Sequence, residues 1–198
     1  MNLPDRAKKI VLQPKQEWEV IATESATTAQ LYTSYVIPLA AIGPIASIIG
    51  MSLIGISVPF IGTYQVPIGA AITHSILSYV LTLVGIFVLA LIIDALAPSF
   101  SGQKNQMQAL KVATYSCTAA WLGGIFSLIP SISILAIIPG IYSLYLLYVG
   151  LPVLMKSPQD KALVYTVVVV IAAILIFLVI GAVSSALVSY YPVPTFQF

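Results

Sequence analysis

The sequence predicts an all-α fold: a polytopic membrane helix bundle with five transmembrane helices, preceded by a short amphipathic N-terminal helix region. The first observation is composition, since 60% of the 198 residues are hydrophobic and only 7% are charged, whereas a soluble domain carries about 25% charged residues. The second is that the charges lie in a few clusters separated by long uncharged stretches. So few charges cannot cover a water-facing surface, so most of the surface must face lipid.

The uncharged stretches set the number of membrane spans. A span needs roughly 20 apolar residues, so the first two long stretches hold two spans each and the last holds one. Prolines and glycines between residues 59 and 69, and the Pro130-Ser131 pair, supply the turns. The runs are continuously apolar, which favours helices over the alternating pattern of barrel strands. The expected spans are 31–56, 69–96, 109–129, 132–154 and 162–187.

The basic residues predict the orientation. With five spans, the N-terminus and the loops 97–108 and 155–161 share one side of the membrane, and this side or the adjoining helix ends hold every Lys and Arg. These residues are Arg6, Lys8, Lys9, Lys15, Lys104, Lys111, Lys156 and Lys161. The positive-inside rule then places the N-terminus in the cytoplasm and the C-terminus outside.

The expected organisation has three parts. They are a cytoplasmic or interfacial amphipathic segment (1–30), a five-helix transmembrane domain (31–190) and an aromatic extracytoplasmic tail (191–198).

The N-terminal segment has two interpretations. Pro14 divides it into two short helices, with an apolar stripe formed by Ile10, Val11, Leu12, Trp18 and Ile21 while Arg6, Lys8, Lys9 and Lys15 face water. The segment then lies on the cytoplasmic leaflet with Trp18 at the headgroup level. Alternatively, it is a docking surface for a cytosolic protein that also uses Glu17, Glu19 and Glu24. The candidate partner or membrane-surface contacts are therefore Arg6, Lys8, Lys9, Lys15, Trp18 and Glu24.

Asp94 lies about one turn from the cytoplasmic end of the second span. An intramembrane acid is often an ion or proton site. Its shallow position also allows a structural role, in which it reaches interfacial water or pairs with Lys104 or Lys111.

Three tyrosines, Tyr142, Tyr145 and Tyr148, form a slanting band on the fourth span. Counting back from Lys156 places Tyr142 and Tyr145 near the midplane, where a hydroxyl needs a partner. They either hydrogen-bond between helices or line a path for a small solute. The full set of candidate functional polar residues is Asp94, Lys104, Lys111, Tyr115, Tyr142, Tyr145 and Tyr148.

The sequence argues against several function classes. It has no Ser-His-Asp set, no cluster of Cys and His, no phosphate-binding glycine loop and no pair of acids in one pocket, so we expect no enzyme, no cofactor and no metal. The net charge of +2 argues against a nucleic-acid partner, which needs a basic face.

Five stretches carry a resemblance to a known family. They are PKQEWEVIATE (14–24), YVIPLA (35–40), IDALAPSF (93–100), QALKVATYS (108–116) and GIYSLYLLYVGL (140–151). In content, order and spacing they resemble the Yip1 domain family, and its bacterial members in particular, over about residues 10 to 180. The sequence departs from the family at Ala119-Ala120, where related sequences often have proline after the Tyr-Ser pair.

The resemblance implies a role in interactions rather than catalysis. Eukaryotic members resemble trafficking factors that associate with Rab-type GTPases and with one another through a cytosolic N-terminal region. Here it implies a non-enzymatic scaffold or membrane-organising protein of the bacterial inner (plasma) membrane. Its expected partners are the lipid bilayer, a second copy, or another membrane or cytosolic protein. The alternative is a small transporter or channel for a proton, ion or metabolite that uses Asp94 and the tyrosine band.

Overall fold

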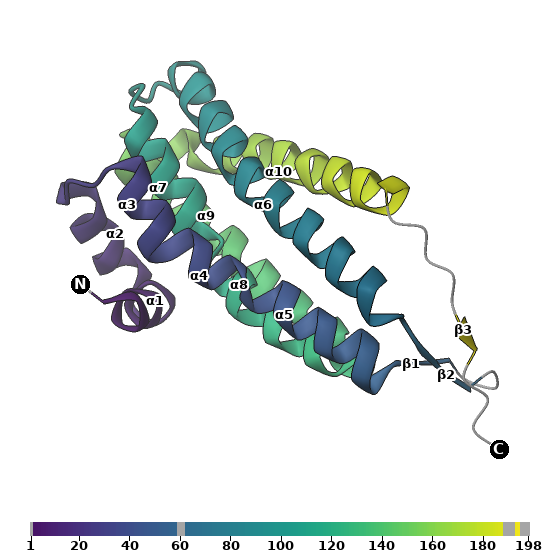
Figure 1. The fold of residues 1–198 in the computed structure, drawn as a ribbon. Coiled ribbons are helices and arrows are strands. Elements are labelled where there is room, and N and C mark those ends of the chain that lie inside the picture. The colour runs from purple at the N-terminus through teal and green to yellow at the C-terminus, as the bar shows by residue number, and fades with distance from the viewer. Residues whose placement is uncertain (1, 59–61, 188–192, 195–198) are drawn as a thin grey trace.

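A computed structural model describes residues 2–58, 62–187 and 193–194, and it confirms the predicted all-α class. The helices of the bundle lie side by side between two ends (Figure 1). The N-terminal helices α1 and α2 cover one end, and a small antiparallel sheet lies at the other. The expected aromatic tail (191–198) falls almost wholly outside the described residues, which leave out Tyr191, Phe196 and Phe198.

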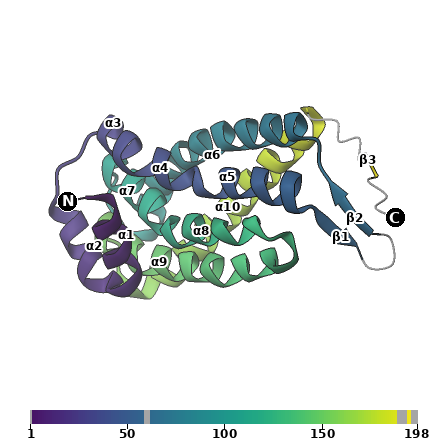
Figure 2. The same cartoon turned by 60° about the horizontal axis from the view of Figure 1, so that its bottom comes forward.

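The N-terminal segment forms two short helices, as Pro14 predicts. Helix α1 (Leu3–Leu12) begins after Asn2, whose side chain accepts a hydrogen bond from the Asp5 N–H at 3.0 Å. Helix α2 (Pro14–Thr23) begins directly at the proline, which is favourable because the first helical position needs no N–H donor. The two helices form a hairpin, hereafter the N-terminal hairpin (3–23), that packs against the bundle (Figure 2).

The first apolar segment is helical but irregular. It contains α3 (Thr28–Leu31), the π-helical turn η1 (Tyr32–Val36), α4 (Ile37–Ala40), α5 (Ile42–Ile49) and a second π-helical turn η2 (Gly50–Ile54). Thr27 and Gln30 form a reciprocal capping box at its start. The Ile37 N–H donates to Tyr32 O rather than to the carbonyl four residues back. Pro38 follows at once and has no N–H, which accounts for the local widening.

Among the residues that the structure describes, four helical segments are long and apolar enough to cross a membrane: Thr28–Ile54, Ile68–Phe100, Pro130–Met155 and Gln159–Ala186. They match four of the five predicted spans. The second comprises α6 (Ile68–Leu96) and the 3-10 turn η3 (Ala97–Phe100). The third comprises η5 (Pro130–Ala136) and α9 (Ile137–Met155), and the last lies within α10 (Gln159–Leu187).

The remaining predicted span, 109–129, has a different character. It consists of α7 (Gln106–Ser116), α8 (Thr118–Gly123) and the 3-10 turn η4 (Gly124–Leu128). Every residue from Ala109 to Ser116 is buried, because α7 packs against α6 and α9 and contacts the N-terminal hairpin through Gln108, Lys111 and Tyr115. A helix enclosed by other helices does not contact lipid, so it can carry Lys111, Thr114 and Ser116 without exposing them to hydrocarbon.

Loops that are distant in sequence meet at each end of the bundle. At the charged end, the Gln103 N–H donates to Met155 O at 2.7 Å and Lys161 Nζ donates to Ser101 Oγ at 2.6 Å. At the opposite end, Gly50 lies against the Ser127 carbonyl oxygen, and a Cβ at position 50 would be only 2.1 Å from it.

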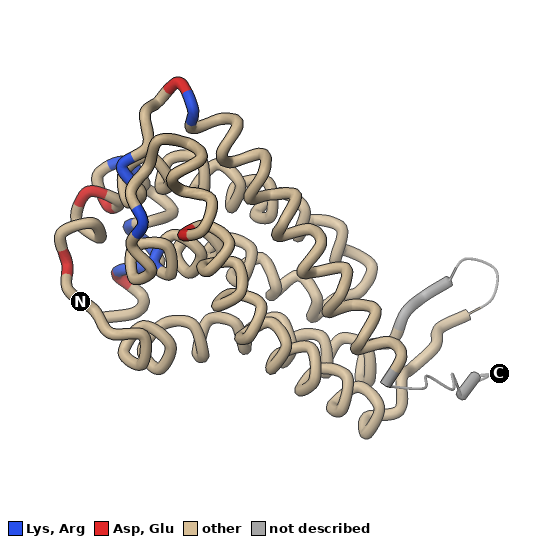
Figure 3. Tube along the Cα trace, turned by 90° about the horizontal axis from the view of Figure 1, so that it is seen from above, with Lys and Arg blue, Asp and Glu red and all other residues tan. Residues whose placement is uncertain are grey.

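A three-stranded antiparallel sheet of β1 (Ile56–Val58), β2 (Gly62–Gln65) and β3 (Val193–Pro194) extends from the end that holds Gly50. Ile56 pairs with Tyr64, and Tyr64 pairs with Pro194. The charged residues lie at the other end of the bundle, the end that carries the N-terminal hairpin, as Figure 3 shows.

Candidate functional site: the polar cluster beneath the N-terminal hairpin

Arg6 is the centre of a charged cluster between the N-terminal hairpin and the bundle. It is only 5% exposed. Its Nη1 donates to Glu17 Oε1 at 2.6 Å, and its Nη2 donates to both carboxylate oxygens of Glu24. Burial by itself lowers the pKa of the guanidinium, but the Glu24 hydrogen bond and the charges of Glu24 and Glu17 outweigh burial, so the pKa is raised overall. Arg6 thus stays charged and links the start of α1 to both ends of α2.

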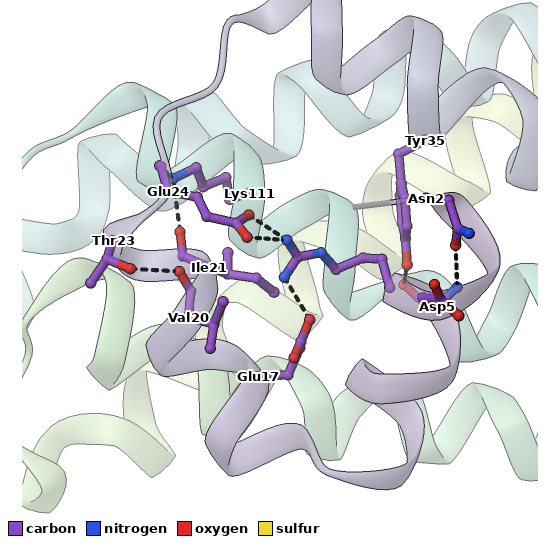
Figure 4. A network of polar contacts seen from close by, with 11 residues as sticks. Asn2, Asp5, Glu17, Val20, Ile21, Thr23, Glu24, Tyr35 and Lys111 are labelled. Carbon is purple, nitrogen blue, oxygen red and sulfur yellow. Dashed lines mark hydrogen bonds and ion pairs between the residues drawn. The ribbon is translucent and has the colours of Figure 1, made fainter.

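Two side chains of α7 satisfy the backbone at the end of α2. Lys111 Nζ donates to Ile21 O at 2.9 Å and to Glu24 O at 2.5 Å. Gln108 Nε2 donates to Ala22 O at 2.9 Å. The last carbonyls of a helix lack intrahelical donors, and a cation is favourable there. Figure 4 shows this arrangement around Lys111, Ile21 and Glu24. Lys111 and Gln108 therefore cap α2 from the bundle.

Three aromatic side chains extend the cluster into the bundle. Tyr115 contacts Trp18 and Tyr35 edge to face, with centroid separations of 6.2 and 4.7 Å. The Arg6 guanidinium carbon lies 5.6 Å from the centroid of the Tyr115 ring, within the range of a cation–π contact. The hydroxyls of Tyr35 and Thr118 are 2.9 Å apart. The hairpin is thereby joined to both the first apolar segment and α7–α8.

A cavity of about 680 Å³ opens beside this cluster. Its walls include Arg6, Glu24, Tyr35 and Tyr115, together with Ser25 and Ser34. The charge of Arg6 is already balanced by two carboxylates, so the cavity does not select an anion.

The structure corrects three predictions for the N-terminal segment. Trp18, expected at lipid headgroups, is completely buried, and Arg6, expected in water, is buried too. Leu12, expected on the buried stripe, is 65% exposed. The physical reason is that the hairpin presents its amphipathic face to protein rather than to lipid. Lys8, Lys9 and Lys15 are exposed, as predicted.

The tyrosines of α9 do not act as one band. The Tyr142 hydroxyl donates to Val11 O at 2.6 Å, which holds the turn of the N-terminal hairpin against α9. The Tyr145 ring lies 5.5 Å from that of Tyr142. Tyr145 and Tyr148 are 40% and 38% exposed, so they lie on the outer surface of the bundle.

Asp94 lies apart from the polar cluster. Its Oδ1 is buried and accepts no hydrogen bond from any described residue, and its charge acts on Tyr165 of α10. The predicted pairing with Lys111 is wrong, because Lys111 is bonded to the carbonyls of α2. Lys104 lies exposed in the loop before α7, and the two ion pairs of Arg6, with Glu17 and Glu24, include neither Lys104 nor Asp94.

Sequence reasoning missed the roles of Glu17, Gln108 and Tyr35. A signal was present for the first of these. Glu17, Ile21 and Glu24 recur at a spacing of four and three residues, which places them on one helix face, and Arg6 shares a face with the apolar Ile10. Charged residues on an otherwise apolar face are candidates for a buried ion pair.

The similarity to known proteins extends over nearly all of the helical part of the chain. The family model for the Yip1 domain matches residues 8–181. The inner membrane protein YohC of Escherichia coli K12 is 25% identical over 180 residues, which cover 89% of this chain and 92% of YohC. YohC of Escherichia coli O6:H1 matches to the same extent, and no solved structure matches. Since the match spans most of the chain, including the N-terminal hairpin from Lys8 onward, this protein belongs to the Yip1 domain family.

Proposed function

We propose that this protein is a non-enzymatic scaffold of an inner membrane, which presents its N-terminal hairpin as a fixed cytoplasmic platform for a second copy or another protein. The polar cluster carries this proposal. Arg6 joins α1 to α2 within the hairpin. Lys111, Gln108 and Tyr142 bond the hairpin to the bundle, so these side chains fix its position rather than await a substrate. The names of the curated relatives, inner membrane proteins, support the membrane assigned here.

Loop contacts support five crossings. The 101–103 loop bonds to Met155 and Lys161, so these two regions lie on the same side of the membrane. The chain between them must therefore cross an even number of times. Since Pro130–Met155 has the length and hydropathy of a span, the segment 106–128 supplies the second crossing.

The charge distribution supports an N-in, C-out orientation. Every Lys and Arg lies in the N-terminal hairpin or in the loops and helix ends at the same end of the bundle. The sequence of the opposite turns, 57–68 and 130–131, has no charge. By the positive-inside rule, the hairpin faces the cytoplasm.

The position of Lys15 supports a membrane boundary near Tyr145. The two residues line one small pocket, and an unpaired ammonium group is costly at the bilayer centre. The path from Pro130 to Tyr145 along η5 and α9 is roughly 27 Å at the usual helical rises, close to the ~30 Å of a hydrocarbon core. The proposal thus moves Tyr142 and Tyr145 from the midplane to the cytoplasmic interface, where exposed tyrosines are common.

No observation favours the transporter alternative. Asp94 interacts with α10, whereas the Tyr142 hydroxyl bonds to the N-terminal hairpin. The two groups thus face different neighbours, and a shared solute path would need the Tyr142 hydroxyl to leave Val11.

Site-specific photo-crosslinking in native membranes tests the scaffold role. A photoreactive amino acid would replace Val20, an exposed apolar residue of α2, and, as a control, Ile134, which is exposed at the other end. We expect reproducible protein adducts, to a second copy or to one partner, from position 20 and not from position 134. If both positions yield only uncrosslinked monomer, the scaffold proposal is wrong.

A further inference from the structure

We propose that the protein binds one anionic phospholipid of the cytoplasmic leaflet where the turn of the N-terminal hairpin meets α9. This inference uses the membrane placement proposed above but not the scaffold role. It rests on two pockets that adjoin each other, one polar and one apolar.

The polar pocket has a volume of about 340 Å³. It is lined by Gln13, Pro14, Lys15 and Gln16 from the hairpin and by Tyr145 from α9. Within the described part of the chain, Lys15 makes no ion pair or hydrogen bond, and neither does the Tyr145 hydroxyl. The pocket thus offers an ammonium group, two amides and a phenol as hydrogen-bond donors. These donors suit a phosphate, for which lysine is a common ligand.

The apolar pocket is a groove of about 420 Å³ between α8–η4 and α9. Leu122, Phe126, Ile138 and Pro139 contribute to its walls. A Cβ at Gly123 would be 2.2 Å from Pro139 Cγ, so this glycine permits the close approach of the two helices. The groove is outside the polar cluster, and its apolar walls suit an acyl chain.

Both pockets are lined by the turn of the N-terminal hairpin and by α9. Val11 and Tyr142 line the groove, while Gln13 and Tyr145 line the polar pocket. The rings of Tyr142 and Tyr145 are 5.5 Å apart. The Tyr142–Val11 hydrogen bond holds the hairpin turn against α9 where the two pockets adjoin.

Ile138 lies about 10 Å farther along α9 than Tyr145, away from the charged end. A head group beside Lys15 therefore has its acyl chain directed into the bilayer.

The surroundings favour a lipid over other occupants. An apolar groove alone would accept many partners. Here a pocket rich in hydrogen-bond donors adjoins the groove on its cytoplasmic side, and this pair matches an amphipathic molecule with a phosphate at one end. Leu12, adjacent to both Val11 and Gln13, is exposed and would enter the same lipid layer. The unpaired charge of Lys15 selects an anionic over a zwitterionic head group.

The test uses the full chain in phosphatidylcholine vesicles with a small fraction of phosphatidylglycerol whose acyl chain carries a photoreactive diazirine. We expect crosslinks to concentrate in residues 119–126 and 138–142. Lys15→Gln should reduce them roughly fivefold, the effect of one lysine near an anionic lipid, while Lys8→Gln should not. The same probe with a phosphocholine head group should crosslink there less and be insensitive to Lys15→Gln.

A second pair of variants tests the groove. Leu122→Trp should fill it and remove the concentrated crosslinks, whereas Leu163→Trp, at a more exposed leucine of α10, should leave them unchanged. Circular dichroism and gel filtration of each variant check that it folds. Crosslinks spread evenly over the lipid-facing helices, or adducts of the groove to a second copy, would overturn the proposal. These lipid crosslinks are independent of the Val20 experiment, so the lipid site and the scaffold role can fail separately.

Discussion

The Trp18 indole lies against the backbone of Gly150, so closely that a Cβ at position 150 would be 2.6 Å from two carbons of the ring. This contact explains how α2 approaches α9 and why a tryptophan near a membrane surface is fully buried. Glycine is required at position 150 because every other side chain would displace the ring.

Gly150→Ala is therefore expected to loosen the N-terminal hairpin. The added methyl group overpacks a closed site, which typically costs about 1–3 kcal/mol. Thermal unfolding in detergent and hydrogen exchange of residues 3–23 would measure the effect. Gly140→Ala in the same helix is the control, since no atom of another element lies within 4 Å of a Cβ there. Equal behaviour of the two variants would show that Trp18 does not depend on this contact.

Arg6→Met is expected to release the hairpin more strongly. It leaves the buried Glu17 carboxylate without its cation, and breaking a buried pair in this way costs about 3–5 kcal/mol. Faster hydrogen exchange and proteolysis within residues 3–23 would report it. Lys8→Met, at an exposed position of the same helix, should change stability by less than about 0.5 kcal/mol.

A double variant separates the charge from the packing. Arg6→Met combined with Glu17→Gln should recover part of the loss, since the buried charge is then gone. If the double variant is as unstable as the sum of the single changes, the ion pair contributes no coupling.

Lys111→Met should weaken the cap on α2. The substitution keeps the length of the side chain but removes the donor to Ile21 O and Glu24 O, and hydrogen bonds to charged groups contribute about 1.5–3 kcal/mol. We expect exchange to increase first at the C-terminal turn of α2. Lys104→Met, in an exposed loop, is the matched control. An unchanged exchange pattern in Lys111→Met would contradict the capping role.

Cysteine labelling would test the five crossings. In a Cys117→Ala background, which removes the one native cysteine, single cysteines replace Thr63, Lys104, Ser131 or Gln159. We expect a membrane-impermeant maleimide added to intact cells to label positions 63 and 131 but not 104 and 159. Labelling of position 159 without position 104 would instead mean that segment 106–128 does not cross.

Local sequence properties predicted much of this molecule. Pro14 divided the N-terminal segment into two helices, and long uncharged runs set four apolar segments, since both depend on neighbours within a few residues. The prediction was weakest for α7. Polar residues lower the hydropathy of α7, so its sequence resembles a membrane span less than the other four segments do. Its enclosure by α6, α9 and the hairpin explains why α7 can carry these polar residues.

The candidate site required contacts that no local pattern specifies. Arg6 and Glu24 are 18 residues apart, and Lys111 and Ile21 are 90 apart. The sequence displayed each charge, but an isolated charge is compatible with water, lipid headgroups or a partner. Placing Trp18 in headgroups was reasonable for a free amphipathic helix and failed because the helix is covered by α9.

The sequence by itself determined that this is a membrane protein of the Yip1 family with its charges at one end, because composition, hydropathy and motif order are properties of the chain alone. Only the tertiary structure decided that the N-terminal segment is a hairpin fixed to the bundle. The physical reason is that a buried charge is tolerated only beside its partner, and which partner lies beside it depends on how the helices pack.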